Sequence, residues 1–106
     1  MQIIHIAGQE NWIYQKDKKT YCTDSLDLVG YIHCCTIDQI EFVLSNWFDS
    51  TQNLVFIYID SEKILSPIRF ENAEEGRDLF PHIYGPINKG AIVKVVFADQ
   101  DKGEKK

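Results

Sequence analysis

Six consecutive apolar residues at positions 54–59, Leu-Val-Phe-Ile-Tyr-Ile, constrain the fold of this chain more than any other segment. The run is rich in β-branched and aromatic residues and is too short for a buried helix, so it predicts a β-strand. Because the run has no polar face, we expect a central strand that is covered on both sides.

Alternating apolar residues predict two further long strands. In residues 2–7, Ile4 and Ile6 share one face and His5 lies on the other. Residues 91–97 would form a closing strand, whose inward-facing side chains are expected to be Val93, Val95 and Phe97. A shorter strand is expected over residues 68–71, with Arg69 and Glu71 on one face.

The strongest helix signal begins at Thr36, which has the capping-box spacing to Gln39. The apolar residues that follow recur at helical intervals and predict a stripe that belongs to the core, with no cofactor role: Ile37, Ile40, Val43, Leu44, Trp47 and Phe48. A polar helix over residues 10–19 would be anchored by Trp12 and Ile13. Ser25 is expected to cap one helical turn over residues 26–29, which Gly30 ends.

Length, charge and cysteine usage limit the class of protein. The 106 residues suit a single globular domain, expected over residues 1–98, with a disordered charged tail over 99–106. The net charge of −5 argues against binding to nucleic acid and favours a small-molecule or protein partner. An odd number of cysteines, no signal-peptide pattern and no membrane-spanning run predict a cytoplasmic protein.

Three histidines in apolar surroundings are the candidates for a shared site. Residues 30–36, Gly-Tyr-Ile-His-Cys-Cys-Thr, predict a strand that brings Tyr31 and His33 to one face. His82 lies in a segment that two prolines and a glycine constrain, and His5 lies in the first strand. We expect the three imidazoles to line one solvent-open cavity. The alternative is that each imidazole is a hydrogen-bonded structural group.

The same residue types could support two other chemistries. Zinc binding by the histidines with Cys35 is disfavoured, because their spacings match no local zinc motif, and no metal is predicted. A Cys35–His nucleophile has only the weak support of a cysteine next to a helix start, and Cys34 is expected to be a small core residue.

The order of several short motifs resembles a known family. These motifs are His5, Trp12, Ser25-Leu26, Gly30-Tyr31-Ile32-His33-Cys34, Ile59-Asp60, Arg69-Phe70-Glu71 and Phe80-Pro81-His82-Ile83-Tyr84-Gly85-Pro86. Over residues 3–97 the chain is similar to the small bacterial family catalogued as domain of unknown function 952. It departs from that family at Cys35, where serine is usual.

The resemblance implies an α+β fold like that of the ADP-ribosyltransferases, with two small antiparallel or mixed sheets, a cleft for NAD and short flanking helices. A shared fold does not establish an activity. In those transferases a first-strand histidine holds the cofactor's ribose, and His5 matches that position. Residues 30–36 resemble the second, histidine-containing motif of RNA 2′-phosphotransferases. Glu71 is the one candidate for the acid of the third motif, although the sequence around it does not match.

The implied function is binding of NAD or an ADP-ribose-like small molecule, with ADP-ribosyl transfer or hydrolysis as the activity. The alternative is a non-catalytic ligand-binding or protein-interaction module that retains the cleft. Glu71 and His33 are the catalytic candidates. The expected ligand-binding residues are His5, which would donate to a ribose hydroxyl or to the diphosphate, and Tyr31, Arg69, His82 and Tyr84. Two purely structural roles are the alternatives: an Arg69–Glu71 ion pair, and a Tyr84 side chain that only anchors its own loop. No resident cofactor is expected, and NAD would be a substrate.

Overall fold

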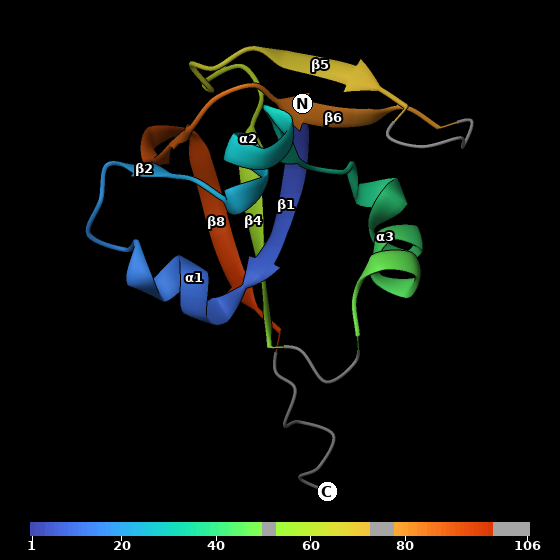
Figure 1. Ribbon diagram of the computed structural model, residues 1–106, viewed down its shortest axis with the longest axis horizontal. Helices are drawn as coiled ribbons and strands as arrows, with labels where there is room; N and C mark the ends of the chain where they lie inside the picture. Colours follow the sequence, from blue (N-terminus) through green and yellow to red (C-terminus); the bar gives the residue numbers. More distant parts are fainter. Residues whose placement is uncertain (50–52, 73–77, 99–106) are drawn as a thin grey trace, which may run out of the picture.

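The computed structural model describes residues 1–49, 53–72 and 78–98, and in these ranges the chain is α+β with small antiparallel sheets and short helices (Figure 1). The predicted tail over 99–106 lies outside the described residues. The elements in chain order are β1 (Gln2–Gly8), α1 (Gln9–Tyr14), β2 (Thr20–Tyr21), α2 (Asp24–Val29), β3 (Ile32–His33), the 3-10 turn η1 (Ile37–Gln39), α3 (Ile40–Trp47), β4 (Leu54–Asp60), β5 (Ile68–Glu71), β6 (Phe80–Ile83), β7 (Ile87–Asn88), η2 (Lys89–Ala91) and β8 (Ile92–Phe97).

The predicted central strand is β4, which pairs with β1 on one side and β8 on the other. Its two faces contribute to two hydrophobic clusters, so it is covered on both sides as expected. Ile57 belongs to the first cluster and Leu54 to the second. On β1, Ile4 and Ile6 pack in the second cluster while Ile3 packs in the first, which confirms the predicted faces.

The predicted inward face of β8 is wrong at two positions. Val93 is 51% exposed and Phe97 is 46% exposed. The register explains the error, because Ile59 pairs with Ile92 while Tyr58 pairs with Lys94, so Val93 is an extra residue at a bulge. The bulge breaks the period of two, and Phe97 lies at the end of the strand.

Helix α1 is shorter than the sequence predicts, and helix α2 is longer. Helix α1 ends at Tyr14, and its expected anchor Ile13 is 51% exposed, whereas Trp12 packs against the core. Helix α2 begins at Asp24, so Ser25 lies inside it rather than at its cap. Gly30 ends this helix as predicted, with a left-handed φ of 91° and its N–H bonded to Leu26 O.

Helix α3 begins with a 3-10 turn in which the N–H of Thr36 donates to Gln39 Oε1 at 2.9 Å. Its apolar stripe is only partly in the core. Val43 is buried, but Ile37 is 57% exposed and Trp47 is 46% exposed. None of the helices in the described ranges is long and apolar enough to cross a membrane.

A smaller sheet of β3, β6 and β5, with β6 in the middle, lies across one end of the β1–β4–β8 sheet (Figure 1). An isolated antiparallel bridge between Ile4 and Cys35 connects β1 to the chain that follows β3. In Figure 1, α3 lies on one side of β1 and α2 on the other. Residues of β1 and of both helices line one cavity.

Candidate functional site

The three histidines line the same cavity, which has a volume of about 710 Å³. His33 and His82 are register partners on the adjacent strands β3 and β6, and their ring centroids are 5.5 Å apart. His5 comes from β1, which the Ile4–Cys35 bridge holds beside β3. The sequence therefore predicted correctly that these imidazoles, far apart along the chain, share one cavity.

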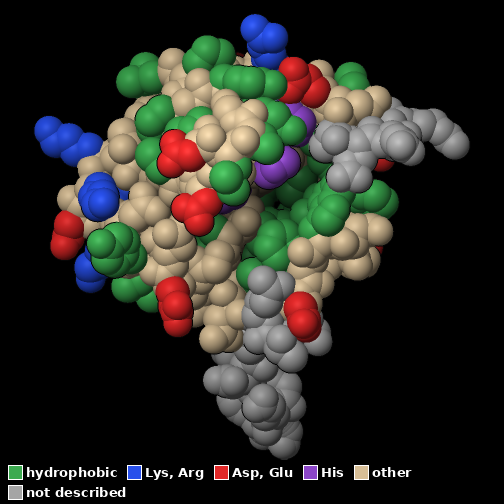
Figure 2. Space-filling view, in the orientation of Figure 1, with side chains coloured by type: hydrophobic (Ala, Val, Ile, Leu, Met, Phe, Trp, Pro, Cys, Tyr) green, Lys and Arg blue, Asp and Glu red, His purple; other side chains and the backbone are tan. Residues whose placement is uncertain are grey.

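The cavity has a polar wall and an apolar wall. The histidines and Tyr31 contribute to the polar wall. The apolar side chains come from α3, from its C-cap and from β6: Val43, Trp47, Phe48 and Phe80. Figure 2 shows the hollow, in which histidine and hydrophobic surfaces adjoin. The prediction that the α3 aromatics serve only the core is thus incomplete, because two of them also line this cavity.

His5 is held as a neutral imidazole with its proton on Nδ1. Its Nδ1 lies 2.6 Å from the carbonyl oxygen of His33, and a carbonyl only accepts, so Nδ1 donates. Burial lowers the pKa of His5 to about 4. Nε2 therefore carries a lone pair at neutral pH, and this buried atom has no hydrogen-bond partner in the described part of the chain.

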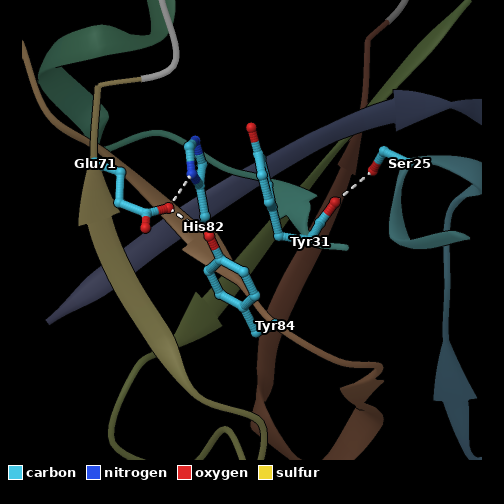
Figure 3. Close-up of polar contacts among 5 residues, drawn as sticks. All are labelled: Ser25, Tyr31, Glu71, His82 and Tyr84. Carbon is cyan, nitrogen blue, oxygen red and sulfur yellow. Dashed lines mark hydrogen bonds and ion pairs between the residues drawn. The ribbon is translucent and has the colours of Figure 1, made fainter. Parts of the chain in front are cut away.

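His82 is fixed on two sides (Figure 3). Its Nδ1 donates to Glu71 Oε1 at 2.8 Å, and the Tyr31 ring stacks on the imidazole with centroids 4.0 Å apart and planes at 13°. Tyr31 is itself held by Ser25, whose hydroxyl donates to its backbone oxygen. His82 is 1% exposed, and its Nε2 is the second buried imidazole nitrogen without a partner among residues 1–49, 53–72 and 78–98.

Glu71 is bound to His82 and also to the hydroxyl of Tyr84, which donates to the same Oε1 at 2.7 Å. The hydrogen bonds from Tyr84 and His82 lower the pKa of Glu71, and the bond to Glu71 raises the pKa of Tyr84. Glu71 is therefore an ionised acceptor at neutral pH. The carboxylate accepts from Nδ1 of His82, so Nδ1 carries a proton, and in the neutral tautomer Nε2 is the acceptor.

The predicted catalytic and ligand-binding residues fall into two groups by their position relative to the cavity. His5, His33, His82 and Tyr31 line the cavity. Glu71, Arg69 and Tyr84 are not among its lining residues. The Arg69 guanidinium lies 5.3 Å from the centroid of the Tyr84 ring, a cation–π contact, while Glu71 bonds to His82 and Tyr84. The Tyr84 hydroxyl thus does more than anchor its own loop.

Several lining residues were missed by the sequence reasoning. Tyr21 is fully buried, and its hydroxyl oxygen accepts from Asn11 Nδ2 at 3.0 Å. Asp24 and Thr23 line the cavity at the start of α2. Tyr21 lies in a two-residue strand, which is too short to show any periodicity, so no sequence signal could have placed it.

The two alternative chemistries gain no support from the geometry. Cys34 and Cys35 are buried, and burial raises the pKa of Cys34 well above its usual value and that of Cys35 to about 11. Both thiols are therefore protonated at neutral pH, which argues against a nucleophilic role. No cluster of three or more His, Cys, Asp or Glu side chains suited to a metal ion occurs in the part of the chain that the structure describes.

Together these features define a small α+β domain with an imidazole-lined cavity. The chain belongs to the family described as Protein of unknown function (DUF952), whose family model matches residues 6–95.

Solved structures of protein CC0527 from Caulobacter crescentus are similar in fold. Its crystal structure has a TM-score of 0.79 at 24% identity, over 93% of this chain and 87% of that chain. A double mutant of that protein gives the same values. Its solution NMR structure has a TM-score of 0.76 at 25% identity, over 92% of this chain and 84% of that chain. No curated protein matches this chain significantly.

Proposed function

We propose that the chain binds a small organic molecule in the histidine-lined cavity. The observation that carries this proposal is the pair of buried, unpartnered Nε2 atoms of His5 and His82, on two residues that line one cavity. Leaving a buried polar atom unpaired costs on the order of 1–3 kcal/mol, and a ligand that supplies the partner offsets that cost. The volume of about 710 Å³ is typical of small-molecule sites.

The ligand class proposed first is NAD or an ADP-ribose-like molecule, as the resemblance to ADP-ribosyltransferases suggests. The apolar wall around Trp47 and Phe80 suits a flat ring. The role expected of His5 changes from donor to acceptor. His5 was expected to donate to the ligand, but its only N–H is engaged by the His33 carbonyl, so Nε2 would accept a hydrogen bond from a ribose hydroxyl.

ADP-ribosyl transfer or NAD hydrolysis would depend on His82 rather than on direct action of Glu71. Glu71 does not line the cavity and bonds to His82 Nδ1. In hydrolysis, the N-glycosidic bond breaks, nicotinamide leaves with the bonding electrons, and water adds to the ribose carbon. Nε2 of His82 would accept the proton that this water loses. The second candidate is a module that binds the ligand without turnover.

A cytoplasmic location is part of this proposal. All three cysteines are free thiols, which supports a reducing compartment.

The proposal is tested by thermal unfolding with millimolar NAD, ADP-ribose, nicotinamide and nicotinamide riboside. A ligand at 100 times its Kd stabilises the native state by about 2.7 kcal/mol. We expect at least one of the four to raise the Tm of the wild type, and Trp47→Ala to reduce this effect. Tyr14→Ala is the matched control, since Tyr14 is exposed and does not line the cavity.

An unchanged Tm with all four compounds would refute this ligand class. Release of nicotinamide from NAD, measured by chromatography, separates the enzyme from the binding module. If ligand binds and turnover occurs, His82→Gln is expected to abolish the turnover. Binding without any nicotinamide release would support the non-catalytic module.

A further inference from the structure

The charged groups of the cavity are the first clue to what it accepts. Among the lining side chains within residues 1–49, 53–72 and 78–98, Asp24 is the only Asp, Glu, Lys or Arg. Two of the chain's cations are engaged at aromatic rings that do not line the cavity: Arg69 lies over Tyr84, and Lys89 lies 5.1 Å from the ring centroid of Trp12. In the described part of the lining, an anionic ligand would therefore meet a carboxylate and no lysine or arginine.

The two unpartnered imidazole nitrogens and the Asp24 carboxylate point to the same conclusion. Nε2 of His5 is an acceptor, because the His33 carbonyl holds the proton on Nδ1. The Glu71 carboxylate holds a proton on Nδ1 of His82, so in the neutral tautomer of this ring Nε2 is the acceptor. The Asp24 carboxylate only accepts. Phosphate and carboxylate groups are themselves acceptors, so they cannot satisfy these atoms.

We propose that the cavity selects a phosphate-free, neutral or cationic ligand that carries hydrogen-bond donors on a flat ring or sugar, and that it rejects the phosphorylated counterpart. This inference rests on the proposed function as far as the small-molecule site is concerned, and it replaces NAD and ADP-ribose, which carry a diphosphate, with a nucleoside-like ligand. The donors of such a ligand would pair with the two imidazole acceptors, and its ring would contact the apolar wall at Trp47 and Phe80. Asp24 sets the preference for charge.

Calorimetric titrations with two matched pairs of probes test the inference. Nicotinamide riboside and nicotinamide mononucleotide differ by one phosphate, as do adenosine and AMP. At about pH 8 free imidazoles are neutral, which minimises attraction of the phosphate by protonated histidine. We expect the phosphorylated member of each pair to bind at least about tenfold more weakly than its nucleoside.

Asp24→Asn tests the origin of the selectivity, with Asp27→Asn as the matched control. Both residues lie in the first turn of α2 and both are exposed, but only Asp24 lines the cavity. We expect Asp24→Asn to narrow the affinity ratio between nucleoside and nucleotide severalfold, and Asp27→Asn to leave it unchanged.

The outcomes separate this inference from the proposed function. Binding of a nucleoside with weak binding of its phosphate ester supports the inference and the small-molecule site, and it counts against NAD and ADP-ribose as the ligands. Phosphorylated probes that bind as well as the nucleosides, or better, overturn the inference and leave the small-molecule site intact. No binding by any of the probes overturns the proposed function for this ligand class. An affinity ratio that responds equally to the two aspartate substitutions overturns the role of Asp24.

Discussion

The neutral state of buried His5 predicts a specific dependence of stability on pH. The pKa of this imidazole is about 4 in the folded protein, against 6.5 when it is unperturbed. The native state therefore resists protonation, while the unfolded chain takes up a proton between these values. Stability from this residue is fully present above pH 6.5, falls as the pH is lowered, and levels off below about pH 4.

The size of the effect follows from the two pKa values. Within the window the free energy of unfolding changes by about 1.4 kcal/mol per pH unit. Between about pH 7.5 and about pH 4.5, the loss from His5 alone is about 2.5 kcal/mol. This loss is large beside the total stability of about 5–15 kcal/mol that is usual for a domain.

Urea unfolding over this pH range, on the wild type and on His5→Asn, measures the effect. The asparagine amide can still donate to the His33 carbonyl, but it does not titrate. Other groups that titrate, such as Glu71, are common to both proteins and cancel in the difference. We expect the difference in unfolding free energy between the two proteins to change by about 2.5 kcal/mol across the range. If the unfolding free energies of the wild type and of His5→Asn changed in parallel with pH, the assignment of a neutral, buried His5 would be refuted.

The remaining predictions concern stability and binding. Gly30→Ala should lower the free energy of unfolding by about 1 kcal/mol, because the left-handed φ of 91° is unfavourable for a residue with a Cβ, whereas the added Cβ would have no atom within 4 Å. Gly85→Ala should cost clearly more in urea unfolding, since its φ is 152° and a Cβ would also lie 2.9 Å from the Cβ of Ser66; equal costs would contradict this. Ile57→Ala should cost about 2–5 kcal/mol as a fully buried residue of the central strand, and a loss below 1 kcal/mol would count against that core. Trp47→Ala should weaken ligand binding, measured by calorimetry, because the side chain lines the cavity. The same substitution should lower the Tm of the ligand-free protein only slightly, because the side chain is 46% exposed.

Patterns that depend on neighbouring residues were readable from the sequence. The apolar run 54–59 predicted the central strand, and Gly30 predicted the end of α2. The convergence of the histidines was also predictable, since each lies in a short constrained or apolar segment of a small chain. Small domains offer few places where such polar groups can be held together.

Features that depend on distant contacts could not be read in this way. The bulge at Val93 depends on the register between β4 and β8, and simple alternation gave the wrong inward face. The pairing of Glu71 with His82 depends on β5 lying next to β6, whereas the sequence suggested the nearby Arg69 as a partner. Trp47 lines a cavity, and the helical spacing of apolar residues alone does not show whether such a side chain faces the core or a cavity.

The most direct test of the site is a long-range ¹H–¹⁵N NMR spectrum of the imidazoles, recorded with and without nicotinamide riboside at about pH 8, where free imidazoles are neutral. We expect His5 to show a protonated Nδ1 and a lone pair on Nε2, and we expect the Nε2 signal to move when the probe saturates the cavity. A proton on His5 Nε2 in the free protein, or imidazole signals that stay unmoved at millimolar probe, would contradict the account.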